Sequence, residues 1–128
     1  ACHPHLKRAK GSVVLIGSVS DDAYAARYSL YGGSKAFLRS FTKHACRELG
    51  FDGIRINLVS PGATQTPMIQ GLIDDGTFPK KMIRDFKKTI PIEQRFARPR
   101  EIAEAVYFAL TGPRYLHGSD IRIDGGID

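Results

Sequence analysis

The stretch SVVLIGS at residues 12–18 predicts the fold of this chain. Its residues are apolar and β-branched, without the polar alternation of a half-exposed strand, which is typical of a strand buried on both faces of a parallel sheet. Two further segments are assigned as strands, IRINLVS at residues 54–60 and the short DIRID at 120–124. We therefore expect three strands, at 12–18, 54–60 and 120–124.

Helical patterns alternate with these strands. From Tyr31 to about Leu49 apolar residues recur at three- and four-residue steps, and Gly50 is expected to end that helix. A second helix is predicted at 99–110, with a proline in its first turn. Residues 69–90 predict one or two short exposed helices. The apolar stripe of the first helix, for which we favour burial in the core over an interface, consists of Phe37, Leu38, Phe41, Ala45 and Leu49.

The order of these elements predicts an α/β fold. Strands that alternate with helices favour right-handed crossovers and a parallel sheet, and 128 residues are enough for a single domain over 1–128. Ligands of such sheets bind beyond the carboxyl ends of the strands. Ser18, Pro61, Gly62 and the start of the Tyr31 helix all fall at this edge, so we look for chemistry there.

The composition bears on whether the protein binds nucleic acid, spans a membrane or forms disulfides. The 19 basic and 13 acidic residues give a net charge of +6, and the densest basic segment is KKMIRDFKK at 80–88. It holds one aromatic residue and no base-reading motif, so we favour a solvated helix face over a nucleic-acid site. No apolar run approaches the roughly 18–20 residues that span a bilayer. Cys2 and Cys46 form neither a metal motif nor a disulfide framework, and we expect reduced thiols in a cytoplasmic protein.

The segment YGGSK at 31–35 suggests acid–base chemistry. Tyr31 and Lys35 are one helical turn apart and share a face. An ammonium near a phenol favours the phenolate and lowers the phenol pKa towards the range that general acid–base catalysis requires. The two glycines between them are poor helix formers, and their small size would let a flat ligand lie close to the helix. Ser18, with Ser20 as the alternative, supplies a hydroxyl at a strand end.

The ordered motifs VVLIGSVS, YGGSK, RINLVSPGATQT, RPREIAEAVYFAL and GSDIRIDGG resemble the carboxyl-terminal half of short-chain dehydrogenases/reductases, over about residues 10–126. The resemblance implies a partial Rossmann-like, doubly wound parallel sheet made of the last three strands and their helices. It also implies an NAD- or NADP-dependent oxidoreductase that interconverts a small-molecule alcohol and a ketone. The family's spacing selects Ser18 over Ser20, and Tyr31 over Tyr24 and Tyr28, which have no lysine four residues on.

The resemblance further implies a role for each site residue. Tyr31 exchanges a proton with the substrate oxygen, Ser18 polarises that oxygen, and Lys35 favours the phenolate and hydrogen-bonds the nicotinamide ribose. Residues 67–92 match the substrate lid in position. The residues expected to line the nicotinamide, its carboxamide or the phosphates are Pro61, Gly62, Thr64 and Thr66. Those expected to be structural are Asn57, Gly125 and Gly126.

The glycine-rich loop that cradles the cofactor pyrophosphate in this family has no match in the sequence. We therefore expect about half of the domain to be absent, and the chain alone to bind NAD(H) or NADP(H) weakly or not at all. Its expected partners are the missing amino-terminal half and further copies of itself in a homo-oligomer. The alternative is a non-catalytic remnant of the family that acts through association. The residues that choose between NAD and NADP would lie in the absent half.

Overall fold

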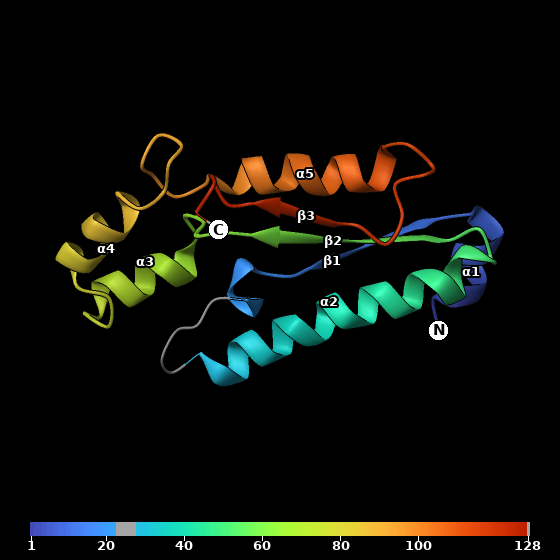
Figure 1. The fold of residues 1–128 in the computed structure, drawn as a ribbon, viewed down its shortest axis with the longest axis horizontal. Coiled ribbons are helices and arrows are strands. Elements are labelled where there is room, and N and C mark those ends of the chain that lie inside the picture. The colour runs from blue at the N-terminus through green and yellow to red at the C-terminus, as the bar shows by residue number, and fades with distance from the viewer. Residues whose placement is uncertain (23–27, 128) are drawn as a thin grey trace.

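The computed structural model describes residues 1–22 and 28–127, which form a parallel sheet between helices (Figure 1). The sheet has three strands in the order β1 (Ser12–Ile16), β2 (Arg55–Pro61) and β3 (Asp120–Ile123). One face carries the long helix and the other the last helix (Figure 1), which confirms the predicted α/β class. The helices are α1 (His3–Ala9), the 3₁₀ turn η1 (Val19–Asp21), α2 (Ser29–Gly50), α3 (Pro67–Asp74), α4 (Lys80–Lys87) and α5 (Pro99–Thr111).

The core is centred on β2. This strand pairs with β1 from Ser12 opposite Arg55 to Ile16 opposite Val59, and its other edge pairs with β3. Every residue from Arg55 to Ser60 is buried, as expected for a strand covered on both faces. β1 departs from that expectation, because its residues are only partly buried and Ile16 is 44% exposed. Among the described strands β1 lies at the edge of the sheet, which explains the difference.

Two polar side chains in β2 form hydrogen bonds to the end of α5 and to the segment between α5 and β3. Arg55 donates from Nη1 to the carbonyls of Ala109 (2.9 Å) and Leu116 (3.1 Å), near the carboxyl end of α5. Asn57 donates to Leu116 O (3.0 Å) and accepts from the backbone N–H of Ser119 (3.1 Å). Asn57 is fully buried, so its contacts are structural, as the sequence predicted.

Several predicted boundaries were wrong. β1 ends at Ile16 instead of Ser18, because Ser18 leaves the ladder and caps η1. Gly50 is the last residue of α2 instead of its terminator, and the left-handed glycine of the following turn is Gly53, with φ of +76°. The amino-terminal helix α1 was not predicted.

The predicted burial of the α2 stripe was only partly right. Ala45 is 5% exposed and Thr42 is 2% exposed, so these residues face the sheet. Phe37 and Phe41, by contrast, are 65% and 47% exposed and stack on each other with ring centroids 5.9 Å apart. The helix therefore buries a narrower face than its apolar pattern predicted.

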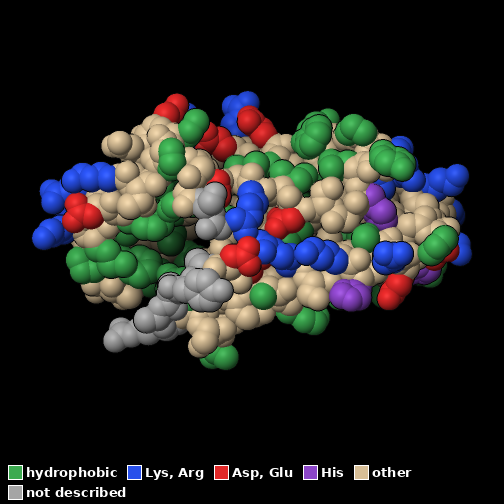
Figure 2. All heavy atoms as spheres, in the orientation of Figure 1, with side chains coloured by type: hydrophobic (Ala, Val, Ile, Leu, Met, Phe, Trp, Pro, Cys, Tyr) green, Lys and Arg blue, Asp and Glu red, His purple; other side chains and the backbone are tan. Residues whose placement is uncertain are grey.

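The segment predicted to hold short exposed helices contains α3 and α4, with a left-handed Gly76 between them. Both helices extend past the carboxyl ends of the strands (Figure 1). Lysine and arginine side chains gather at this end of the molecule, over α4 (Figure 2). None of the described helices is long and apolar enough to span a membrane. Within 1–22 and 28–127, no group of three His, Cys, Asp or Glu side chains is suited to hold a metal ion.

Candidate functional site

The carboxyl ends of all three strands point towards the same edge of the sheet (Figure 1). The turn after β1 carries Ser18, and the loop after β2 carries Gly62 and leads into α3. α2 begins near the same edge, with Tyr31 in its first turn. The predicted catalytic and cofactor-binding residues therefore belong to elements that end or begin on one side of the molecule.

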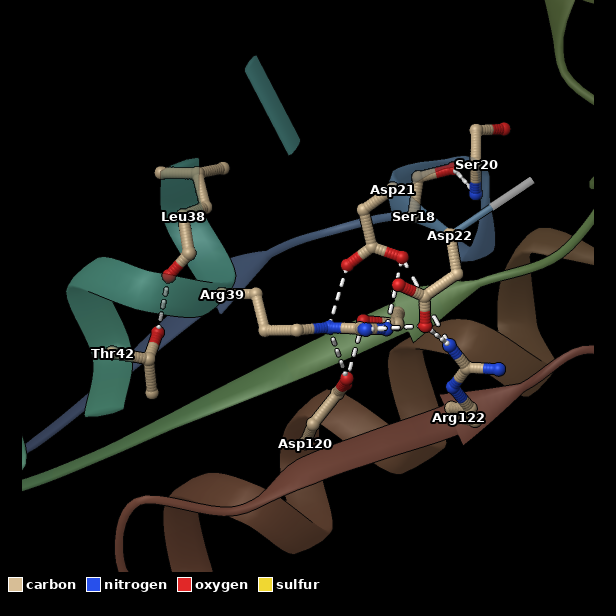
Figure 3. A network of polar contacts seen from close by, with 10 residues as sticks. Ser18, Ser20, Asp21, Asp22, Leu38, Arg39, Thr42, Asp120 and Arg122 are labelled. Carbon is tan, nitrogen blue, oxygen red and sulfur yellow. Dashed lines mark hydrogen bonds and ion pairs between the residues drawn. The ribbon is translucent and has the colours of Figure 1, made fainter. Parts of the chain in front are cut away.

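Ser18 is 7% exposed and has an extended backbone. It caps η1, because its Oγ accepts a hydrogen bond of 3.1 Å from the backbone N–H of Ser20. This bond occupies one lone pair and leaves the hydroxyl proton available for another acceptor. The alternative serine, Ser20, points its own side chain away from Ser18 (Figure 3).

Tyr31 and Lys35 approach each other as their spacing predicts. Lys35 Nζ lies 5.6 Å from the centroid of the Tyr31 ring. The same ammonium donates a hydrogen bond of 3.0 Å to the carbonyl of Ile16, the last residue of β1. Tyr31 is 43% exposed, and its ring meets that of Tyr28 edge to face at 6.0 Å. Tyr24, the other alternative, lies outside the described residues.

Packing explains one of the two glycines that follow Tyr31. A Cβ atom on Gly32 would lie 2.8 Å from the carbonyl oxygen of Ser20, so the first turn of α2 needs glycine there to pack against η1. A Cβ atom on Gly33 would have no neighbour within 4 Å in the part of the chain that the structure describes. The sequence-based explanation, a ligand close to the helix, was therefore unnecessary for Gly32 and remains a prediction for Gly33 alone.

The loop after β2 is held close to the end of β3. Gly62 donates to the carbonyl of Ile123 (2.9 Å), and a Cβ atom on Gly62 would lie 2.8 Å from Asp124 Cα. Thr64 Oγ1 donates to Gly62 O (3.0 Å), and Thr66 caps α3 by accepting from the backbone N–H of its third residue. Each threonine hydroxyl keeps further hydrogen-bonding capacity. Pro61 is the partly buried last residue of β2.

The sequence did not reveal a cluster of charged residues beside Ser18, which we call the Arg39 cluster (Figure 3). Its members are Asp21, Asp22, Arg39, Asp120 and Arg122. Burial raises the pKa of Asp21, whose side chain is 1% exposed, and the charge of Arg39 opposes that rise. The hydrogen bond from Arg39 is the main cause that lowers the pKa of Asp22. These residues come from η1, α2 and β3, so no local spacing pattern could have indicated the cluster.

Comparisons with known proteins place the chain in a family. A family model described as enoyl-(acyl carrier protein) reductase matches residues 1–128. Carbonyl reductase family member 4 of Danio rerio is 37% identical over 117 residues, which are 91% of this chain and 45% of the relative. Vibriobactin-specific 2,3-dihydro-2,3-dihydroxybenzoate dehydrogenase of Vibrio cholerae is 40% identical over 126 residues, 93% of this chain and 47% of the relative.

A solved structure agrees with these relatives. ElxO with NADP bound superposes with a TM-score of 0.82 at 29% identity, covering 97% of this chain and 49% of that chain. The chain thus spans about half the length of the relatives it matches. The fold is the predicted partial, Rossmann-like sheet. Because the family model matches all 128 residues and the related proteins are reductases and dehydrogenases, the chain belongs to the short-chain dehydrogenase/reductase family of oxidoreductases.

Proposed function

We propose that this chain is the catalytic half of an NAD(P)-dependent oxidoreductase that interconverts an alcohol and a ketone, and that it acts together with an amino-terminal dinucleotide-binding half. The observation that carries the proposal is the hydrogen bond from Lys35 Nζ to Ile16 O. It joins the helix turn beside Tyr31 to the end of β1, two residues before Ser18.

Each of the three side chains then has a distinct task. Tyr31 moves a proton between its phenol oxygen and the substrate oxygen, acting as acid in ketone reduction and as base in alcohol oxidation. Ser18 donates its hydroxyl proton to the same oxygen, since the bond that it accepts from Ser20 N–H leaves that proton free. Lys35 supplies positive charge beside the phenol and stabilises the phenolate that forms when Tyr31 releases its proton.

The residues at this edge fit the nicotinamide and ribose part of the cofactor. An ammonium has three N–H donors, and Lys35 uses one of them on Ile16 O, which leaves two for ribose hydroxyls. At Gly33 none of the described residues covers the helix surface. The residues proposed to line the ring and its carboxamide are Pro61, Gly62, Thr64 and Thr66. When bound, the nicotinamide supplies or accepts the hydride. Either NAD or NADP satisfies these contacts.

The test combines complementation with a matched pair of variants. The chain is mixed with, or joined to, the amino-terminal half of carbonyl reductase family member 4, and ketone-dependent oxidation of NADH and NADPH is followed. We expect turnover, loss of turnover in Tyr31→Phe with cofactor affinity kept, and near-normal turnover in Tyr28→Phe, which removes a neighbouring phenol. Retained turnover in Tyr31→Phe overturns the assignment.

One observation supports self-association, which the second candidate, a non-catalytic association module, requires. Phe37 and Phe41 form a stacked, exposed aromatic pair on α2, and exposed apolar pairs of this kind are typical of contact surfaces. We propose a second copy of this chain as the occupant in either case, which gives a homo-oligomer. Sedimentation of the chain and of the Phe37→Ser/Phe41→Ser variant tests this. An oligomer in the first and a monomer in the second are expected.

A further inference from the structure

Three cationic or phenolic side chains project from one face of α2 at four-residue steps: Tyr31, Lys35 and Arg39. The first two belong to the proposed reaction. Lys35 holds the carbonyl of Ile16, just before Ser18. The third side chain, Arg39, holds the segment just after Ser18, so the serine lies between two anchor points on the same helix.

Arg39 makes its contacts with three carboxylates (Figure 3). Its Nη2 donates to Asp21 Oδ1 (2.9 Å), its Nε lies 2.7 Å from Asp21 Oδ2, and its Nη1 donates to Asp22. The same Nε lies 3.1 Å from Asp120 Oδ2 in β3. Asp120 in turn accepts from Ser60 Oγ in β2 (2.6 Å). One guanidinium therefore connects η1 and α2 to β3, and Asp120 extends this connection to β2.

The burial of Asp21 makes this connection costly to break. Its side chain is 1% exposed, and a buried carboxylate without a paired cation is strongly unfavourable. Arg122, on β3, also faces these carboxylates. Its Nη2 lies 2.7 Å from Asp22 Oδ2 but 3.9 Å from Asp21 Oδ1, which is farther than Arg39 lies from Asp21. Arg39 is the nearer cation for Asp21, so removing its guanidinium favours a position of η1 in which Asp21 reaches water.

We propose that Arg39 is a positioning residue, which fixes Ser18 relative to Tyr31 by holding η1 against α2. The inference rests on the proposed function, in which both hydroxyls contact one substrate oxygen. The path from Arg39 to Ser18 is short: Asp21 ends η1, and Ser18 caps the same turn through Ser20 N–H. A shift of η1 moves Ser18, whereas Tyr31 stays on its helix.

The first arm of the test needs no catalysis. Amide hydrogen exchange of residues 17–22 is measured in the wild-type chain, in Arg39→Met and in Arg39→Lys. The matched control is Lys43→Met, which removes a charge at the next four-residue step of α2. No ion pair of Lys43 is found among the described residues. We expect exchange at 17–22 to rise about tenfold or more in Arg39→Met, to rise less in Arg39→Lys, and to stay unchanged in Lys43→Met.

The second arm uses the complemented enzyme. A shift of roughly 1 Å in a catalytic group costs on the order of 100-fold in rate, so we expect kcat to fall about 100-fold in Arg39→Met with an unchanged KM for the cofactor, and partial recovery in Arg39→Lys. Unchanged exchange at 17–22 overturns the proposal, as does faster exchange with an unchanged kcat. If Arg39→Met does not fold, Arg39→Lys carries both arms, and wild-type exchange and kcat in that variant overturn the proposal.

The two proposals fail in different ways. Retained turnover in Tyr31→Phe contradicts the proposed function. Hydrogen exchange in the Arg39 variants still measures, independently of catalysis, whether Arg39 holds η1. Loss of turnover in Tyr31→Phe, together with wild-type exchange and turnover in Arg39→Met, contradicts only the positioning role.

Discussion

Replacing Arg55 by methionine is expected to lower the free energy of unfolding by about 2–4 kcal/mol. Arg55 is 5% exposed and donates to the carbonyls of Ala109, Leu110 and Leu116. Each hydrogen bond to a charged group contributes roughly 1.5–3 kcal/mol, so three of them contribute at least about 4.5 kcal/mol. Methionine relieves the cost of burying a charge, which offsets part of this loss, and its chain fills most of the volume of the arginine stem.

Urea denaturation followed by circular dichroism measures this loss. The matched control is Arg100→Met on α5, whose side chain is 88% exposed and, among residues 1–22 and 28–127, pairs only with Glu104. Exposed pairs of this kind contribute about 0.3–0.5 kcal/mol. A loss for Arg55→Met below about 1 kcal/mol, or equal to that of Arg100→Met, would show that the relief of desolvation cancels the three hydrogen bonds.

The packing of Gly32, the ion pair of Glu101 and the affinity for the cofactor can each be tested. Gly32→Ala should destabilise the protein by about 1–3 kcal/mol, because its methyl group meets the Ser20 carbonyl at 2.8 Å, whereas Gly33→Ala should be neutral or stabilising; denaturation midpoints that rank them in the opposite order would contradict this packing. Hydrogen bonds from Arg95 lower the pKa of Glu101 from 4.5 to about 2, so its contribution to stability is present above pH 4.5 and is lost as the pH falls towards 2. The difference in thermal midpoint between wild type and Glu101→Gln should therefore shrink across that window; a difference that stays constant would show that Glu101 does not titrate there. Calorimetry of the 128-residue chain with NADH or NADPH should detect weak binding or none, and tight binding would refute the need for a second half.

The strands and helices that have a local residue pattern could be predicted from the sequence. The apolar run at 12–18 predicted a strand, which the structure has at Ser12–Ile16. The predicted burial on both faces was wrong for that strand, and it is found instead in β2, from Arg55 to Ser60. The period of α2 predicted a helix, but it could not predict which flank of the stripe would meet the sheet. Phe37 and Phe41 are exposed for that reason.

In the candidate site, too, contacts within one helical turn could be predicted from the sequence, and contacts between distant elements could not. The approach of Tyr31 and Lys35 followed from a spacing of one helical turn, and it is observed. The contacts of Arg39 join residues that lie 17 and 18 positions apart in the chain, and others in β3. Such contacts arise only when the helix crosses the sheet, and no period in the sequence encodes the crossing. The requirement for Gly32 likewise comes from the backbone of η1, which the sequence alone did not place.

In the proposed function, folding brings the hydroxyls of Ser18 and Tyr31 to one substrate oxygen. A crystal structure of the complemented enzyme with NAD(P) and a ketone analogue measures this directly. The account predicts that Ser18 Oγ and Tyr31 Oη both lie within about 2.6–3.2 Å of the analogue's oxygen. An analogue oxygen held by other groups, with Ser18 and Tyr31 too far apart to contact it together, would contradict the account.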